Sequence, residues 1–300
     1  MKRKITFSYI LASLFSRNAK NLKFIPDELY LKILFRGYTG RKLNLANPRS
    51  FNEKLQWLKI NDRNDEYTTL VDKYEVKEVV SKIIGKEYII PTLGIWESFD
   101  EIDFDKLPQK FVLKCTHDSG GIVICRDKNT FDLKKAKKVI NKSLKKNFFY
   151  LGREYPYKKV KPRIICEEYM EDINQKSLID YKFYCFEGEP QFLYVSQGLE
   201  NHATARLSFI NLDWTFAPYY RHDYFQFEKL PKKPKNFDRM VDFAKKLSKG
   251  KKFIRVDLYE INDKIYFSEL TFTPGSGWMA FKNESEDIAM GKFLNLNEVK

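Results

Sequence analysis

The chain has 300 residues, of which 43% are hydrophobic and 16% aromatic, and its formal net charge is +14. This composition is typical of a globular protein with a substantial buried core and excludes an intrinsically disordered chain. The positive charge favours polyanionic partners such as acidic sugars, phosphates, nucleic acid or anionic lipid, without distinguishing among them.

The amino terminus begins with three basic residues, 2–4, before an apolar segment, 5–15, that is too short to span a bilayer. Polar residues interrupt the segment and no small-x-small cleavage site follows it, so we expect no signal peptide. One helical face of the segment carries Phe7, Ile10, Leu11 and Leu14. This face fits either a helix resting on anionic lipid or a helix packed on its own domain.

Residues 1–87 predict a mainly helical region. Ser50 and Glu53 have the spacing of a capping box, and Leu55 and Leu58 follow on the face that should pack inward. A second helical pattern covers 67–84 and ends at Gly85.

From residue 88 onward, short apolar segments alternate with turns. We expect strands over 88–91, 110–115, 122–125, 163–170, 181–186, 191–195 and 205–211, and helices over 133–146 and 237–248. Two further strands, which form a final hairpin around a turn at 262–264, lie within a stretch that covers 253–277. Sequential hairpins with helices before and between them predict an α+β fold with antiparallel sheets, whereas a doubly wound parallel sheet fits poorly.

The cysteines give no sign of a metal site. Cys115, Cys125, Cys166 and Cys185 each lie in an apolar, strand-like segment, none forms a CxxC pair, and the three histidines are scattered. We therefore expect no zinc site and buried free thiols, as in a reducing cytoplasm.

The final hairpin brings two carboxylates together. With a three-residue loop at 262–264, Asp257 lies directly opposite Glu269. Like charges opposite each other destabilise a strand pair, and Mg²⁺, which typically binds one or two carboxylates plus substrate phosphates, would remove that cost. The alternative is a surface hairpin with two solvated acids.

A second signal surrounds Lys114, at the end of an apolar strand where an ammonium group is costly unless it meets an anion. The loop 116–121 follows, and Gly120 and Gly121 would let backbone N–H groups approach a phosphate. The alternative is a hairpin loop with a snorkelling lysine. A Walker loop is excluded because no Gly-Lys pair precedes Ser or Thr, and a protein kinase has its glycine loop before its lysine.

A third signal is the strand that ends in Glu167 and Glu168, which can offer backbone groups and a carboxylate to an adenine edge. Beyond it, Asp180 and Lys182 alternate onto one strand face, where they can meet ribose or metal and phosphate. The alternative is a solvated outer face of an antiparallel sheet.

In content and order these segments resemble the ATP-grasp superfamily, and most closely the branch named for teichuronopeptide biosynthesis, whose members are often labelled glycosyltransferases. The similarity runs from about residue 25 to the C-terminus and rests on residues 47–58, 111–121, 180–184 and 269–277. It implies an ATP-grasp fold in which residues 88–160 supply the phosphate lysine and the glycine loop. Residues 161–300 would supply the adenine hinge and the metal site.

The resemblance also implies the site residues. ATP would be contacted by Lys114, His117, Ser119, Gly120, Gly121, Glu167, Glu168, Tyr169, Met170, Asp180 and Lys182. Mg²⁺ would be bound by Asp257, Glu269 and Thr271. The chain departs from the family at Thr271, because many ATP-grasp proteins have Asn there.

The activity implied is that of an ATP-dependent carboxylate–amine ligase, which forms an acyl phosphate and then an amide. Lys182 and Arg255 would stabilise charge during the transfer, since this chemistry needs positioning and neutralisation more than covalent help. Arg255 would also contact the substrate, together with the turn residues Gly275, Ser276 and Gly277.

The expected partners are an amino acid and an acidic or amino sugar, free or linked to a nucleotide or lipid, in a bacterial surface polysaccharide pathway. We expect a cytoplasmic protein with peripheral contact to the inner membrane face, and no nucleic acid partner. One rival function is a nucleotide-sugar glycosyltransferase, for which Asp103 and Asp105 form a DxD pair in an apparent surface loop. The other is a polyanion-binding protein without catalysis.

Overall fold

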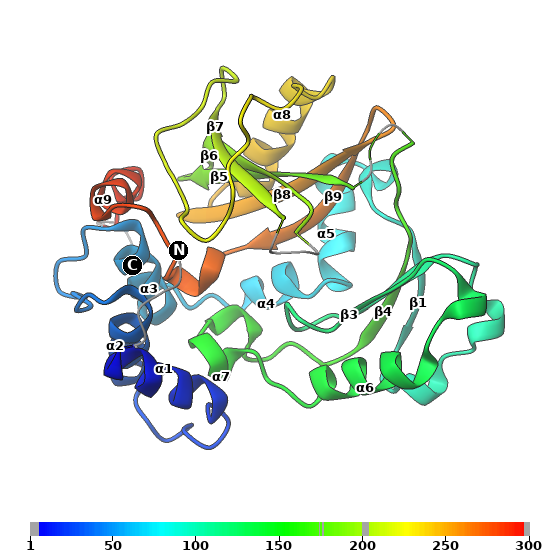
Figure 1. Cartoon of the computed structure of the whole chain (residues 1–300), viewed down its shortest axis with the longest axis horizontal. Coiled ribbons are helices and arrows are strands. Elements are labelled where there is room, and N and C mark those ends of the chain that lie inside the picture. The colour runs from blue at the N-terminus through cyan, green and yellow to red at the C-terminus, as the bar shows by residue number, and fades with distance from the viewer. Residues whose placement is uncertain (1–5, 174, 176, 200–203, 297–300) are drawn as a thin grey trace.

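A computed structural model of the chain describes residues 6–173, 175, 177–199 and 204–296, so the basic residues 2–4 lie outside the described part. The helices are α1 Phe7–Arg17, α2 Asp27–Thr39, α3 Phe51–Asn61, α4 Glu66–Val71, α5 Glu75–Ile84, α6 Leu133–Leu144, α7 Phe149–Gly152, α8 Phe237–Ser248 and α9 Glu284–Gly291. The strands are β1 Thr92–Trp96, β2 Phe111–Cys115, β3 Ile122–Cys125, β4 Ile164–Glu168, β5 Ile179–Phe186, β6 Glu189–Gln197, β7 Arg206–Asn211, β8 Phe253–Ile261 and β9 Lys264–Thr271. Two antiparallel sheets confirm the predicted α+β class (Figure 1).

The small sheet has the order β1-β4-β2-β3, and α6 covers one of its faces (Figure 1). Ala136 and Ile140 of α6 pack against Phe111 and Leu113 of β2. Strand β4 pairs with β1 and β2, although the expected boundary after residue 160 assigned it to the C-terminal subdomain. The boundary therefore moves to the segment between β4 and β5, because the buried side chains of β4 complete the core of the small sheet.

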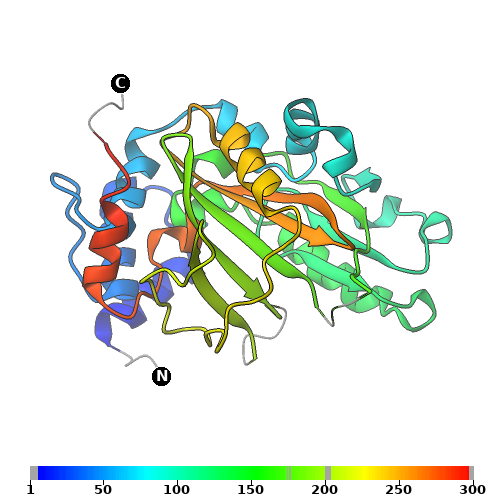
Figure 2. The same cartoon turned by 90° about the horizontal axis from the view of Figure 1, so that it is seen from above.

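The large sheet has the order β7-β6-β5-β8-β9. Figure 2 shows α8 lying across one of its faces, where Met240 and Phe243 pack on Phe183 and Val256. Part of the opposite face packs against α3 and the segment before α9. The rest of that face is polar and carries the predicted site.

The N-terminal region is mainly helical, as predicted, but the helix expected over 67–84 differs in detail. Ser50 and Glu53 form the predicted capping box at the start of α3. The single helix expected over 67–84 is wrong, because Asp72 accepts hydrogen bonds from the backbone N–H groups of Tyr74 and Glu75 and so begins a separate helix, α5.

The strand expected over 88–91 is also misplaced, since β1 begins only at Thr92. Pro91 has no N–H to donate to a strand ladder and instead precedes the strand. Its carbonyl oxygen accepts a hydrogen bond from the backbone N–H of Glu168 at 3.1 Å.

The predicted pairing of Asp257 with Glu269 in the final hairpin is confirmed, although the turn differs from the predicted one. Ile261 pairs with Lys264, so the turn contains only Asn262 and Asp263, whose φ angles of 50° and 63° suit a two-residue hairpin turn. A β-bulge between Asp257 and Leu258 then shifts the pairing by one residue. The shorter turn and the bulge compensate, and Asp257 lies opposite Glu269.

All four cysteines are buried and free, as expected. Within the described residues, no helix combines the length and the apolar character that a membrane span needs.

Candidate active site

A row of charged side chains crosses three neighbouring strands of the large sheet. Lys182 of β5 is paired with Asp257 of β8, which is paired in turn with Glu269 of β9. Arg255 and Thr271 form the next row on the same face, because strand side chains alternate with a period of two. The structure therefore brings together the residues predicted for phosphoryl transfer and metal binding.

Arg255 connects this row. Its Nε and Nη2 atoms donate hydrogen bonds to the two carboxylate oxygens of Asp257 at 2.7 and 2.6 Å. Nη2 also lies 3.1 Å from Oε1 of Glu269 and 3.0 Å from Oγ1 of Thr271. Lys182 donates from Nζ to Oδ2 of Asp257 at 2.7 Å. Both oxygens of Asp257 are thus engaged by cations.

The cations of this row offset the repulsion between its carboxylates. Asp257 has no exposed surface, and burial raises its pKa although Arg255 and Lys182 oppose this change. Burial raises the pKa of Glu269, but Lys182 and Arg255 lower it by more, to about 2. Burial lowers the pKa of Lys182, whereas Asp180 and Asp257 raise it well above its usual value. Charge repulsion alone therefore does not require a metal here, and Mg²⁺ stays a prediction.

The residues present fit part of a Mg²⁺ site. The described residues contain no group of three or more acidic, histidine or cysteine side chains that could hold a metal. Mg²⁺ needs only one or two protein carboxylates when phosphates and water complete its shell. The side chain of Glu269 is 41% exposed, so its carboxylate can reach an ion. The hydroxyl of Thr271, which accepts a hydrogen bond from the same Arg255 nitrogen that contacts Glu269, lies beside it. Asp257 could join only by releasing a contact to Arg255 or Lys182.

In the small sheet, Lys114 of β2 is held by Glu167 of β4. Nζ of Lys114 lies 2.6 Å from Oε2 of Glu167, and Lys77 of α5 pairs with Oε1. Burial raises the pKa of Glu167, but Lys114 and Lys77 lower it by more than burial raises it, and the resulting pKa is about 2. The side chain of Glu167, predicted beside adenine, is thus committed to positioning Lys114. Sequence motifs did not indicate Lys77, because the contact joins segments distant in the chain.

The charges of the two sheets act on one another. Burial lowers the pKa of Lys114, but Glu167 of its own sheet, followed by Glu269 and Asp180 of the large sheet, raises it overall. Lys73 lies between α4 and α5. Burial lowers its pKa, and Glu269 opposes this change without reversing it. Burial raises the pKa of Tyr157 well above its usual value, and nearby carboxylates including Glu269 add to this effect. Lys73 and Tyr157 belong to no recognisable motif, so the sequence did not reveal them.

The loop between β2 and β3 is supported by α6. Asp118 accepts hydrogen bonds from the backbone N–H of Gly121 at 3.1 Å and from the hydroxyl of Ser143. His117 is buried behind the loop, with Nε2 3.2 Å from the carbonyl oxygen of Ser143. Residues 119–120 at the tip are exposed. The tip of the loop, and not the side chain of His117, is therefore accessible to a phosphate.

The predicted adenine hinge connects the two sheets. Glu168 is exposed, and Tyr169 and Met170 are half-buried. The turn of the final hairpin docks on the following residues, because the N–H of Asn262 donates to Oδ2 of Asp172 at 2.9 Å. The side chain of Asn262 in turn accepts from the N–H of Ile173 at 3.1 Å. These two hydrogen bonds fix the connection relative to the final hairpin.

The Pro274–Gly277 turn is fixed by residues from other segments. Gln56 and Lys59 of α3 donate to the carbonyl oxygen of Ser276 at 3.0 and 2.7 Å. Glu154 accepts a hydrogen bond from the hydroxyl of Ser276. Burial lowers the pKa of Lys59 to about 8, although Glu154 opposes this change. Positive φ angles of 56°, 54° and 71° occur at Gly275, Ser276 and Gly277. The predicted acceptor turn is therefore rigid.

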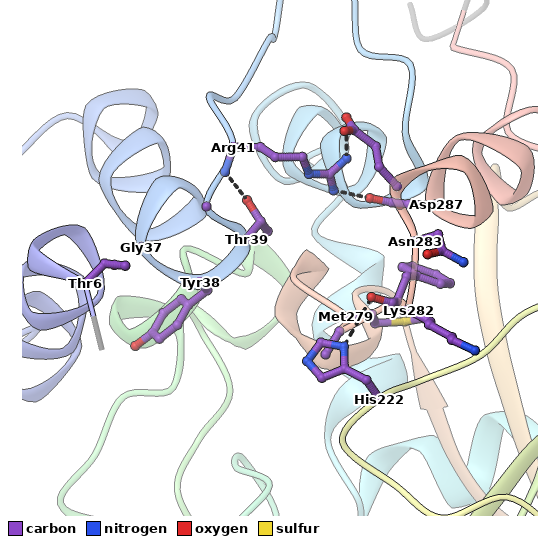
Figure 3. A pocket seen from close by; sticks show the side chains of 14 residues that line it. Thr6, Gly37, Tyr38, Thr39, Arg41, His222, Met279, Lys282, Asn283 and Asp287 are labelled. Carbon is purple, nitrogen blue, oxygen red and sulfur yellow. Dashed lines mark hydrogen bonds and ion pairs between the residues drawn. The ribbon is translucent and has the colours of Figure 1, made fainter. Parts of the chain in front are cut away.

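A separate hollow of about 410 Å³ lies between the end of α2 and residues 279–287 (Figure 3). Its lining includes Arg41, His222 and Lys282 and none of the residues predicted from the sequence. Figure 3 shows Arg41 directed at Asp287, with which it forms an ion pair. The lining combines charged side chains of both signs with apolar residues such as Met279 and Phe281. Met279 and the residues after it follow the Pro274–Gly277 turn closely in the chain.

We predict that Glu167 makes stability depend on pH. Its pKa is about 2 in the folded protein and about 4.3 in an unfolded chain, so its contribution is complete above about pH 5 and shrinks as the pH falls. Between pH 7 and pH 3 the free energy of unfolding should fall by roughly 2 kcal/mol less in Glu167→Gln than in the wild type, as measured by urea titration. The exposed Glu171→Gln should behave like the wild type. An equal pH dependence in all three proteins would contradict this assignment.

We predict that the two glycines of the loop differ. A Cβ at Gly121 would lie 2.6 Å from Cβ of Ser143 and 2.8 Å from Sγ of Cys115, whereas a Cβ at Gly120 would meet nothing within 4 Å. Gly121→Ala should lower the free energy of unfolding by roughly 1–3 kcal/mol, and Gly120→Ala by less than about 1 kcal/mol. Equal losses in chemical denaturation would show that the loop is not packed in this way.

The chain is similar to a known protein family and to several solved structures. A family model described as TupA-like ATPgrasp matches residues 53–295. No curated protein sequence is significantly similar to the chain. Among solved structures, the chain is similar to the ATP complex of D-alanine–D-alanine ligase from Bacillus anthracis, with 14% identity over 68% of this chain and 55% of that chain and a TM-score of 0.39.

Two further structures are similar at comparable levels. D-alanine–D-alanine ligase from Helicobacter pylori matches with 13% identity over 83% of this chain and 70% of that chain, and a TM-score of 0.42. The ATP-grasp ligase PsnB, complexed with a variant of its minimal precursor, Mg and ADP, matches with 9% identity over 85% of this chain and 65% of that chain, and a TM-score of 0.42.

The segment matched by the family model includes both sheets and every residue predicted to bind ATP, Mg²⁺ or the acceptor. The resemblance of the motifs and the ATP-grasp fold are thereby confirmed, and the chain belongs to the TupA-like ATP-grasp family.

Proposed function

We propose that the protein is an ATP-dependent ligase that activates a carboxylate as an acyl phosphate and joins it to an amine. The observation that carries this proposal is the Lys182–Asp257–Glu269 row, together with Lys114 of the other sheet, whose pKa Glu269 of the row helps to raise. Cations from both sheets and an accessible carboxylate are the groups that phosphoryl transfer requires.

The phosphates of ATP would lie between the sheets. Lys114 and Lys182 would bind them, and residues 119–120 of the β2–β3 loop would cover them. Support comes from Glu167, which holds Lys114 in place while the side chain of Lys114 stays 26% exposed. A lysine positioned in this way loses little conformational entropy when it binds a phosphate.

Mg²⁺ would be held by Glu269, with the hydroxyl of Thr271 or a water beside it, and by Asp257 after exchange of one ion pair. When bound, the ion would neutralise charge on the phosphate oxygens. Arg255 touches Asp257, Glu269 and Thr271, so it would lie next to the transferred phosphoryl group and stabilise its charge.

In the reaction, a carboxylate oxygen of the substrate attacks the γ-phosphorus, which gives the acyl phosphate and ADP. The amine nitrogen then attacks the acyl carbon, phosphate leaves, and the amine proton passes to solvent. The rigid Pro274–Gly277 turn would orient the acyl group next to β9, because Gln56, Lys59 and Glu154 already fix its conformation.

For the substrates we propose an amino acid and an acidic or amino sugar of a bacterial surface polysaccharide. The net charge of +14 favours acidic glycans. The hollow next to the Pro274–Gly277 turn could hold a polar part of such a substrate, since Lys282 and His222 line it together with Arg41, which is paired with Glu284 and Asp287. The buried free cysteines suit a reducing compartment, and we place the enzyme in the cytoplasm.

The glycosyltransferase alternative gains no support from its DxD pair. Asp103 and Asp105 are exposed. Asp103 accepts from the N–H of Asp105 at 3.1 Å and pairs with Lys106 at 3.0 Å, as in an ordinary surface turn. Neither residue belongs to the charged row or to the contacts of Lys114.

Trapping of the acyl phosphate tests the proposed function. The protein would be incubated with ATP, Mg²⁺, hydroxylamine and a panel of amino acids and uronic acids, and hydroxamate and ADP would be measured. We expect both products with one carboxylate of the panel, and a loss of at least about 100-fold in Glu269→Gln with the fold intact by circular dichroism. The exposed Asp242→Asn is the matched control and should retain activity.

A contrary outcome is equally definite. Hydroxamate formation that is unchanged in Glu269→Gln would remove Glu269 from the reaction. Consumption of a nucleotide sugar without any use of ATP would replace the ligase by a glycosyltransferase.

A further inference from the structure

Helix α1 is fixed to the rest of the chain by one face only. Ala12 is fully buried against α2, and the two helices approach so closely that a Cβ at Gly37 would overlap the side chain of Ala12. The helix begins with a side-chain cap, because the hydroxyl of Thr6 accepts a hydrogen bond from the N–H of Tyr9. The helix lies at the periphery of the molecule in Figure 1. One face is therefore committed to the domain.

The opposite face of α1 exposes large apolar side chains. The exposed fractions are 81% for Phe7, 47% for Ile10 and 49% for Leu14. At 3.6 residues per turn these positions fall within an arc of about 60°. Phe24, in the connection to α2, is 80% exposed. Clustered exposed apolar side chains of this size are typical of interaction surfaces.

The same segment is basic. Residues 6–25 contain three basic residues and no acidic residue. These three, Arg17, Lys20 and Lys23, are all exposed. An apolar face combined with a purely basic flank is typical of helices that lie in the interface of an anionic membrane.

We propose that α1 and the connection that follows it bind the surface of a membrane containing anionic lipid. Phe7, Ile10 and Leu14 insert among the lipid headgroups, and the basic residues contact lipid phosphates. The helix has 11 residues and is about 16 Å long, so it lies on the membrane and does not cross it. A second copy of the chain suits this surface less well, because a symmetric dimer would place the same basic flank against itself.

The test is co-sedimentation of the full chain with phosphatidylcholine vesicles that contain either no phosphatidylglycerol or about a third of it. We expect binding to the anionic vesicles and at least tenfold weaker binding to the neutral ones. Phe7→Ser/Ile10→Ser/Leu14→Ser should weaken binding to anionic vesicles at least tenfold. Arg17→Glu/Lys20→Glu should weaken it by about fivefold or more per residue.

Two matched controls separate this surface from general properties of the chain. Phe216→Ser/Phe225→Ser/Leu230→Ser removes exposed apolar side chains elsewhere, and Lys134→Glu/Lys138→Glu reverses exposed charges on α6; both should bind like the wild type. Thermal unfolding would check that every variant folds.

Three outcomes would overturn the proposal. One is equal binding by the wild type and the α1 variants, and another is equal loss in the control variants. The third is a dimer in analytical ultracentrifugation that the triple α1 variant disperses, because α1 would then bind a second copy. The result is independent of the ligase reaction, which uses none of these residues.

Discussion

The complete burial of one carboxylate, that of Asp257, constrains the rest of the site. A buried charge is costly unless it is paired and hydrogen-bonded, and removing one partner of such a pair typically costs about 3–5 kcal/mol. Arg255 supplies one partner from β8 itself, and Lys182 supplies the other from β5, so burial of Asp257 favours the β5–β8 register that places Lys182 opposite it. The β8–β9 pairing brings Glu269 to an accessible position on the same face.

The face of the large sheet that carries this charged row has an apolar part and a charged part. The apolar part is covered by α3 and the segment before α9, and the charged part faces the small sheet. The helical N-terminal region therefore does more than precede the ATP-grasp sheets. Through Gln56 and Lys59 it fixes the Pro274–Gly277 turn, and through Lys73 and Lys77 it contributes cations beside the β2–β3 loop and beside Glu167.

Local patterns in the sequence predicted the parts of the fold that depend on local physics. The capping box of α3, strands β2 and β3, helix α8 and the opposition of Asp257 and Glu269 were correct. The last success concealed two errors that cancel, a turn one residue too long and a missing bulge, because residue spacing alone cannot distinguish these two arrangements. The break between α4 and α5 was missed because helical periodicity continues through Asp72, whose side chain ends it.

Long-range contacts account for what the sequence could not reveal about the site. Glu167 was predicted beside adenine from the sequence, but its ion pairs were not, because only the folded chain places Lys77 and Lys114 on either side of its carboxylate. Lys73 and Tyr157 lie in segments without motifs and join the site through packing. The central claim, that the two sheets hold ATP between Lys114 and the charged row, is tested most directly by a crystal structure with Mg²⁺ and a non-hydrolysable ATP analogue. Our account predicts phosphate oxygens within hydrogen-bond distance of Lys114 and Lys182 and an ion bound by Glu269, and a nucleotide bound away from both lysines would contradict it.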